Sequence, residues 1–360
     1  MPSDSRRHLL VLSLLREWAG TAAAPHAWTA DEAAAVWPLL QAHGVEALLG
    51  ASLPPDLLEP AMRGAVAASR ERTALLLMEL ERLLPVVRAA GCDPLVLKGA
   101  GLALAVYPDP LSRWFVDLDL LVAPDEVEGV CEALIGHGYK PFRSRADWEY
   151  YDAHHLHRIL VGPARSVVEV HWALTLPISA YHHDAAGVRG RGRPAAAGAQ
   201  ACRVAAPADQ LIHSAYQHIA DGFVDLRRAA DYVMLVRTMT PADWDQAYRL
   251  AREGGVTRPL SFVLHVMKFM TGVAAPDGLA PAQPLGPLAW RFLDNLDVPG
   301  GLIDRRARHR QDYDQILHLI LLPTLALRMR DTARLLAGHG AYPAAAHGHG
   351  PLGQAPRRLR

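Results

Sequence analysis

Apolar side chains recur every three to four residues through much of the first 90 positions, which is the spacing of one face of a helix. The spacing is clearest from residue 61 to residue 90, and Thr29-Ala-Asp-Glu32 has the pattern of a capped helix start. The pattern predicts an N-terminal helical region over residues 1–90. Helical spacing returns later and predicts a C-terminal helical domain over residues 207–337, with helices at 209–220, 224–238, 241–253, 258–270, 287–296 and 313–336.

Between these regions the pattern changes to short β-compatible runs separated by turns. Residues 91–177 predict a compact core whose strands fall at 94–97, 113–122, 156–161 and 166–172. The chain is therefore expected to be an α+β protein in which a small mixed β-sheet is flanked by N-terminal and C-terminal helical regions. Residues 178–206 are rich in Gly, Arg and Ala and predict a linker or flap, and residues 338–360 predict a disordered tail.

Two acidic residues interrupt the most apolar of these strands. Asp117 and Asp119 share one face of the run 113–122, because side chains alternate between the faces of a strand. Two like charges within about 7 Å repel each other and lose hydration, and a divalent cation between them offsets both costs. Glu169 and His171 share a face of a second strand in the same way. The pattern predicts a Mg²⁺ (or Mn²⁺) site formed by Asp117, Asp119 and Glu169; the competing interpretation is a solvated strand edge.

The charge balance narrows the choice of partners. With 37 basic and 37 acidic residues, the chain has no net charge to attract a polynucleotide, so a long nucleic acid is not expected as a partner. Nearly all the basic residues are arginine, as in proteins from GC-rich bacterial genomes. A lysine retained against that bias is informative, and Lys98 lies directly before Gly99 and upstream of the acidic strand.

The cysteines and the apolar runs indicate where the protein works. Its three cysteines are widely spaced and lack a C-x-x-C pair, which fits a reducing compartment, so a cytoplasmic location is expected. No uninterrupted apolar run reaches the ~20 residues that span a bilayer, so no membrane association is expected. An apolar run over residues 8–15 imitates a secretory signal, but Arg16 and Glu17 end it and favour an amphipathic helix.

Three motifs together resemble a known superfamily. Leu97-Lys-Gly-Ala100, Asp117-Leu-Asp119 and Val168-Glu-Val-His-Trp172 are similar to motifs of the nucleotidyltransferases of the DNA polymerase β type, and most closely to an uncharacterised K-G-A / D-x-D / E-x-H-W branch. The resemblance implies a mixed sheet, Mg²⁺ and an NTP donor, with ATP expected. It also implies transfer of an NMP to a hydroxyl or phosphate of a small molecule, peptide or protein. Asp117 and Asp119 would bind the metal, and Glu169 would lie near the acceptor hydroxyl.

The phosphate-binding half of the resemblance is atypical. The superfamily usually has Gly-Ser or Gly-Gly after its first strand, whereas this chain has Gly99-Ala100 and lacks the hydroxyl. Lys98, Gly99 and Arg113 are the candidate phosphate contacts, Lys98 as a point charge and Arg113 as a planar fork. The departure leaves open an alternative, a catalytically inactive nucleotide-binding or partner-binding module on the same fold.

Three further residues are candidates for contacting the acceptor or for supporting the site: His171, His213 and Asp231, the last two on successive predicted helices near Arg227 and Arg228. The competing interpretation is that His171 is a core residue and that His213 and Asp231 join helices by hydrogen bonds. A metal phosphohydrolase that uses His183-Asp184 is a second alternative. Its chemistry needs the His-Asp pair on a packed helix, whereas this pair lies beside the predicted linker.

Overall fold

The computed structural model describes residues 4–177, 179, 181–220 and 226–276 of the chain. The expected helices at 287–296 and 313–336 and the expected tail at 338–360 lie outside the described residues. Within the described part, no helix combines the length and the apolar character needed to cross a membrane. The molecule is mixed α+β, as the sequence predicts.

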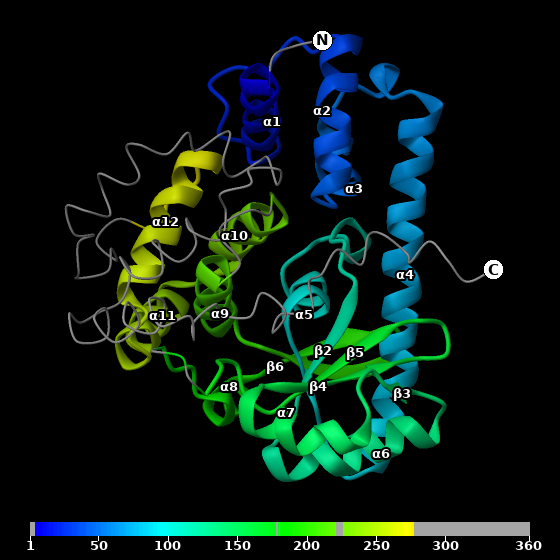
Figure 1. Cartoon of the computed structure of the whole chain (residues 1–360). Helices are drawn as coiled ribbons and strands as arrows, with labels where there is room; N and C mark the ends of the chain where they lie inside the picture. Colours follow the sequence, from blue (N-terminus) through cyan, green and yellow to red (C-terminus); the bar gives the residue numbers. More distant parts are fainter. Residues whose placement is uncertain (1–3, 178, 180, 221–225, 277–360) are drawn as a thin grey trace, which may run out of the picture.

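The N-terminal and C-terminal helices pack into one helical unit. Buried residues of both groups, such as Leu14, Leu40, Trp244 and Phe262, belong to a single hydrophobic core. In Figure 1, α1, α2 and α3 lie above the sheet, α9 to α12 lie to its left, and α4 runs down its right side. The helices are α1 (Asp4–Trp18), α2 (Ala30–Ala42), α3 (Glu46–Leu49) and α4 (Pro60–Ala89) at the start, and α9 (Pro207–Ala220), α10 (Leu226–Thr238), α11 (Pro241–Glu253) and α12 (Thr257–Thr271) at the end.

Hydrogen bonds connect the two ends of this unit. The Arg16 guanidinium of α1 donates to the carbonyls of Phe269 (2.5 Å) and Met270 (3.3 Å) at the end of α12. The capping box that the sequence predicts at Thr29 is present, because the Thr29 side chain accepts from the backbone N–H of Glu32 and the Glu32 carboxylate accepts from the Thr29 N–H. The two helical regions that the sequence separates are thus continuous in space.

The sheet is mixed, and in the described part of the chain it has seven strands in the order β3-β4-β5-β2-β1-β7-β6. Two neighbouring pairs, β2/β5 and β1/β7, are parallel, and the other pairs are antiparallel. The strands are β1 (Leu95–Val96), β2 (Asp117–Leu121), β3 (Lys140–Pro141), β4 (His157–Val161), β5 (Val167–His171), β6 (Arg193–Ala197) and β7 (Gln200–Val204). Shorter helices connect them: α5 (Lys98–Ala105), α6 (Val127–Gly136), α7 (Trp148–His154) and α8 (Ala185–Arg191).

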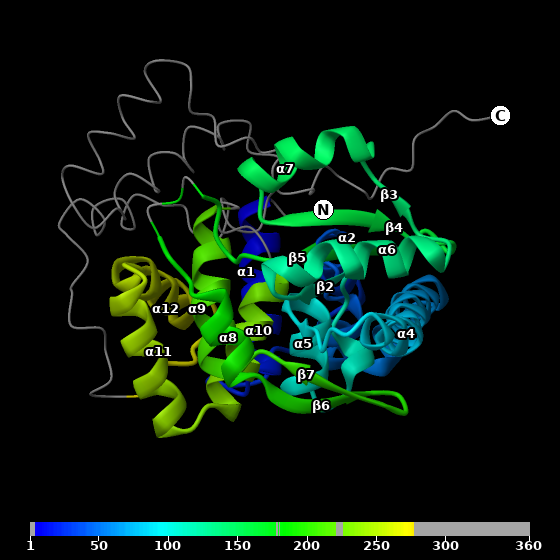
Figure 2. The same ribbon diagram turned by 90° about the horizontal axis from the view of Figure 1, so that it is seen from below.

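The two faces of the sheet have different chemistry. One face is apolar: Leu118 and Leu120 of β2 and Val168 and Val170 of β5 share a core with buried residues of α4 and α6. Figure 2 shows the sheet with α4 and α6 beside it on one side and α8, α9 and α10 on another. Because side chains alternate along each strand, the acidic residues of β2 and β5 point to the opposite face.

Residues 178–206, expected as a linker or flap, instead contribute α8, β6 and β7, and β7 pairs with β1 in parallel. The small residues that predicted a linker instead allow close packing and a tight turn. Ala197 is fully buried in the core shared with α4, and Gly198 adopts φ +58° in the turn between β6 and β7. Composition alone therefore predicted a linker or flap where the structure has a β-hairpin, because alanine and glycine suit close packing and tight turns as well as flexible chain.

The Gly101→Ala substitution is expected to destabilise the protein by about 1–3 kcal/mol, the cost of inserting an extra methyl group into a packed core. A Cβ at Gly101 in α5 would lie 2.7 Å from the Val96 carbonyl oxygen of β1, and this backbone atom has little freedom to move. Thermal denaturation measures the change. Gly64→Ala in α4 is the matched control: a Cβ there meets nothing within 4 Å, so it should stabilise the helix by roughly 0.5–1 kcal/mol. Equal effects of the two substitutions would contradict the close approach of α5 to β1.

Candidate active site

Asp119 and Glu169 are brought together by the parallel pairing of β2 and β5. Asp119 is opposite Glu169 and Leu121 is opposite His171 in the register of the two strands. Neighbouring residues in register point to the same face. Asp119 is fully buried and Glu169 is 5% exposed, whereas Asp117, at the start of β2, is partly exposed. Two strands that are 50 positions apart in the sequence therefore place three carboxyl groups on one face.

Lys98 supplies a positive charge to these carboxylates. Its ammonium Nζ lies 2.6 Å from Asp119 Oδ1 and 3.2 Å from Glu169 Oε2, and the side chain is 18% exposed. Lys98 adopts φ +45°, a conformation that is costly for a residue with a side chain and that clusters at functional sites. The strained backbone lies where β1 turns into α5. The retained lysine thus bridges two of the predicted metal ligands.

The electrostatics of the three acids differ. Burial together with the negative charges of Asp119 and Glu169 raises the pKa of Asp117 to about 7. Burial alone would also raise the pKa of Glu169, but the Lys98 ammonium and the neighbouring histidines hold it well below the usual value. For Lys98, burial opposes the charged form, and the attraction of Asp119 and Glu169 outweighs it and raises the pKa above that of a free lysine. One ammonium therefore leaves the negative charge at Asp117 largely uncompensated.

Two histidines complete the polar cluster. His171 Nε2 lies 2.9 Å from Asp119 Oδ1 and 3.1 Å from Glu169 Oε2, and His157 Nδ1 of β4 lies 3.7 Å from Glu169 Oε2. His171, a candidate acceptor contact or supporting residue, thus contacts two of the acids directly. His157 was not among the candidate site residues. The hairpin of β4 and β5 places His157 opposite His171, so counting outward from the Gly162-Pro163 turn identifies it.

The donor atoms at the site fit a divalent cation. Asp119 Oδ2 is buried without a hydrogen-bond partner, and so are both ring nitrogens of His157. Ligand atoms of His157, Glu169 and His171 all lie within 4.8 Å of one another. Carboxylate oxygens suit Mg²⁺ and Mn²⁺, and nearby imidazoles favour Mn²⁺ or another transition metal. A divalent cation at this site would satisfy the Asp119 Oδ2 oxygen, which is buried without a hydrogen-bond partner.

Arg113 and Asp231 are joined to each other in the structure. Arg113 is 8% exposed and its Nε and Nη2 donate to the two oxygens of Asp231, at 2.6 and 2.7 Å. The Tyr107 hydroxyl also donates to Asp231 Oδ1, at 2.7 Å. Both residues were candidates for direct contact with the nucleotide or the acceptor. Their geometry is instead that of a buried ion pair between α10 and the chain leading into β2.

Gly99 and His213 lie at the margins of the carboxylate cluster. A Cβ at Gly99 would lie 2.5 Å from Phe115 Cβ, so a glycine is needed where α5 passes the start of β2. Both ring nitrogens of His213 on α9 are buried without a partner. Burial together with the positive charge of Lys98 holds the pKa of His213 well below the usual value, so this imidazole is neutral.

The residues of the phosphohydrolase alternative are dispersed. His183 Nε2 lies 3.3 Å from Asp209 Oδ1, and Asp231 is held by Arg113. Asp184 precedes α8 and is exposed. The His and acid residues that do converge are those of β4 and β5 rather than His183 and Asp184.

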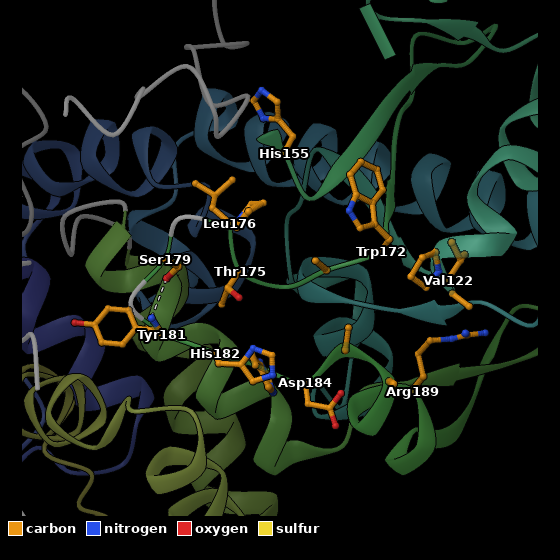
Figure 3. Close-up of a pocket in the computed structure, with 17 residues that line it drawn as sticks. Val122, His155, Trp172, Thr175, Leu176, Ser179, Tyr181, His182, Asp184 and Arg189 are labelled. Atoms are coloured by element: carbon orange, nitrogen blue, oxygen red, sulfur yellow. Dashed lines mark hydrogen bonds between the residues drawn. The ribbon is translucent and has the colours of Figure 1, made fainter. Parts of the chain in front are cut away.

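A cavity of about 480 Å³ opens beyond the carboxyl ends of β2 and β5. Figure 3 shows His155 and Leu176 on one side of it and His182 and Asp184 on the other, with Trp172 at the end of β5. Trp172 directly follows His171, so the cavity begins where the carboxylate-bearing strands end. Its size and mixed aromatic and polar lining are typical of a small-ligand site.

Sheet and site together define a nucleotidyltransferase-like protein, with a mixed sheet, a D-x-D strand, and a third acid on the parallel neighbour. A family model described as "Uncharacterised nucleotidyltransferase" matches residues 25–272. The chain belongs to this family, which confirms the superfamily predicted from the three motifs. The matched residues include α2 to α4 and α9 to α12, whereas α1 precedes them. No curated protein matches the chain.

Proposed function

We propose that the protein is a Mg²⁺-dependent enzyme that moves an NMP from an NTP, with ATP as the expected donor, to a hydroxyl or phosphate of a small molecule, peptide or protein. The observation that carries the proposal is the convergence of Asp119 and Glu169, in register on parallel strands, with Asp117 two residues away on the same face. Family membership supports nucleotidyl transfer in general.

Each residue of the site has a distinct role in the proposal. A bound divalent cation would neutralise the triphosphate oxygens and lower the pKa of the attacking hydroxyl. Asp117 and Asp119 hold that cation, and Glu169 completes the set and orients the acceptor hydroxyl. His171 Nε2 lies within hydrogen-bond distance of both Asp119 and Glu169 and orients the two carboxylates. Lys98 neutralises the carboxylates without metal and moves to the phosphates of the nucleotide when a cation takes its place.

The acceptor is proposed to bind in the cavity beyond β2 and β5. Glu169 is three residues before Trp172, which lines the cavity, so about 10 Å of chain separates the two. A volume of about 480 Å³ suits a small molecule or one side chain of a peptide better than a polynucleotide. The neutral charge balance of the chain favours the same choice.

One observation favours a second candidate, a nucleotide-binding module without turnover. The Lys98 ammonium already bridges Asp119 and Glu169, and a lysine that stayed there would exclude a metal from that position. Calorimetry with a panel of NTPs in Mg²⁺, followed by mass spectrometry for nucleotide adducts on candidate acceptors, separates the two functions. Binding without adducts supports the module, and adducts support the enzyme.

The Glu169→Gln substitution is expected to abolish adduct formation while nucleotide binding persists. The amide keeps the shape of the side chain but loses the negative charge near the acceptor hydroxyl. Losing several kcal/mol of transition-state stabilisation corresponds to about 10³-fold in rate. Initial rates of adduct formation measure the loss. Glu79→Gln is the control, because Glu79 is also a largely buried acid but contacts Arg82, Tyr139 and Ser166 on the other side of the sheet. Undiminished transfer by Glu169→Gln would overturn the role of Glu169.

A further inference from the structure

A second group of metal-binding side chains lies on the β4 side of the carboxylates. One nitrogen each of His157 and His171 and one oxygen of Glu169 lie within 4.8 Å of one another, and all three residues are buried. Two imidazoles and one carboxylate are a common ligand set for transition metals, whereas Mg²⁺ is bound through oxygen atoms. The chemistry of this group therefore differs from that of Asp117 and Asp119.

The separations between the ligand atoms fit direct coordination of one metal ion. His171 Nε2 lies 3.1 Å from Glu169 Oε2, and His157 Nδ1 lies 3.7 Å from the same oxygen. Ligand atoms that are about 2.1 Å from a metal ion lie about 3.0–3.4 Å from their neighbours in octahedral or tetrahedral geometry. The observed separations are close to these values, so the three atoms are already arranged around a position that suits a metal ion.

The nitrogen atoms of the two histidines lack hydrogen bonds within the described part of the chain. Both ring nitrogens of His157, which is 4% exposed, are buried without a partner, and so is Nδ1 of the fully buried His171. A buried polar atom without a partner costs free energy, and coordination to a metal ion offsets that cost. The unpartnered imidazole of His157, with Nδ1 directed toward Glu169, therefore points to a ligand.

The fold holds these ligands in place before a metal binds. The hairpin of β4 and β5 sets His157 opposite His171, and their rings meet edge to face with centroids 4.7 Å apart. Side chains on paired strands lose little conformational freedom when they bind a metal ion. Lys98 Nζ already lies 3.4 Å from His171 Nε2 and 3.2 Å from Glu169 Oε2. Two of the three ligand atoms thus lie beside a cation in the metal-free protein.

The group lies at the edge of the sheet where the cavity opens. His157 begins β4 and His171 ends β5, and these strands are antiparallel, so the two residues share that edge. His155, two residues before His157, and Trp172, directly after His171, line the cavity, and Figure 3 shows both side chains along its upper side. A hydroxyl of a molecule bound in the cavity therefore reaches the histidines before it reaches Asp117.

We propose that His157, His171 and Glu169 form a site for a transition metal of the Zn²⁺ and Co²⁺ class, distinct from the Mg²⁺ site of Asp117 and Asp119. Bound there, the metal would activate the acceptor hydroxyl at the edge of the cavity. This role rests on the proposed function, with Glu169 shared by the two cations. The metal site itself rests on the contacts of the two histidines, and its test needs no nucleotide.

The test measures Co²⁺ binding to the full-length protein after its metals have been removed with EDTA. Co²⁺ is the probe because the affinity of a nitrogen-containing site rises from Mn²⁺ to Co²⁺ and because bound Co²⁺ absorbs visible light. The wild type is expected to bind Co²⁺ that Zn²⁺ displaces and that an excess of Mg²⁺ leaves in place. His157→Leu should weaken Co²⁺ binding at least about 100-fold, because losing a residue that only orients a metal ligand already costs about 10–100-fold.

His43→Leu is the matched control. His43 is also buried, at 1% exposed, but lies in the helical unit, where its Nδ1 accepts from the Leu226 N–H at 3.4 Å. It should leave Co²⁺ affinity unchanged. Melting in EDTA shows whether each variant is folded, and His157→Leu should not melt earlier than the wild type, because the substitution removes no hydrogen bond of His157.

A measurement on the wild type decides the matter even where His157→Leu does not fold. The proton NMR spectrum of the Co²⁺-bound protein should show two strongly shifted imidazole N–H resonances, which correspond to His157 and His171. Absence of these resonances overturns the proposal, and so does unchanged Co²⁺ affinity in folded His157→Leu, which would place the ion on other side chains. Failure to bind or transfer any nucleotide is a different result, because it overturns the proposed function and leaves Co²⁺ binding in place.

Discussion

Asp117→Asn is expected to make the metal-free protein more stable and its metal binding weaker. In the metal-free protein, burial and the charges of Asp119 and Glu169 raise the pKa of Asp117 to about 7, so its ionised form opposes folding. Removing the charge should stabilise the protein by ~1–2 kcal/mol at pH 7–8. The same change removes a metal ligand and should lower Mn²⁺ affinity by about 10–100-fold or more. Thermal denaturation in EDTA and the paramagnetic resonance signal of free Mn²⁺ measure the two effects.

The pH dependence of the stability gain has a definite sign. The folded pKa of Asp117 lies above the unfolded value, so the wild type loses stability as pH rises from about 4 to about 7, and it loses no more above that range. The gain from Asp117→Asn should therefore be absent near pH 4 and largest above pH 7. Asp243→Asn is the control, because Asp243 is a buried carboxylate that caps α11 and pairs with Arg193. It should cost stability and leave Mn²⁺ affinity unchanged. Unchanged Mn²⁺ affinity in Asp117→Asn would contradict the assigned metal site.

Lys98→Met is expected to destabilise the metal-free protein and to enlarge the stabilisation that Mn²⁺ provides. The substitution removes the ammonium 2.6 Å from the fully buried Asp119 and leaves a buried charge without a cation. Breaking a buried ion pair costs about 3 kcal/mol, or roughly 6–12 °C in melting temperature. A cation that binds the vacated carboxylates restores the charge balance, and its binding free energy adds to stability. Thermal melts with EDTA and with graded Mn²⁺ test both parts.

The control for Lys98→Met is Lys268→Met on α12, a lysine of the helical unit whose side chain is exposed. It should change neither the melting temperature in EDTA nor the response to Mn²⁺. If Mn²⁺ stabilised Lys98→Met and the wild type by the same amount, the lysine and the metal would not compete for the same carboxylates. The binding-only interpretation would then lose the observation that favours it.

The acidic strand shows which features of the candidate site can be predicted from local sequence alone. Alternation alone predicted that Asp117 and Asp119 share one face and that Leu118 and Leu120 take the other, and the structure has that division. The motif order identified Glu169 as a third acid, and the parallel register with Asp119 bears out its place on the same sheet face. These inferences succeed because the period of a strand is a property of the backbone and does not depend on which strands are neighbours.

The partners of Lys98 and Arg113 were harder to predict from the sequence. Lys98 was expected at phosphates and lies on carboxylates, and Arg113 was expected at phosphates and pairs with Asp231 on α10. A long side chain takes the partner that offers the best compensation for lost hydration, and that partner comes from a distant segment. The strands β6 and β7 were also missed, because their place in the sheet depends on the pairing of β7 with β1 rather than on their own composition.

The sequence by itself determined the class of the protein and the faces of its acidic strands, and it predicted the three carboxylates of the candidate site, because these follow from local periodicity and from motifs. Only the tertiary structure decided which charges meet. It placed Lys98 between Asp119 and Glu169 and joined Arg113 to Asp231 of α10. Electrostatic partners are chosen by proximity in space at low dielectric constant, and proximity between residues that are distant in the sequence is a property of the fold.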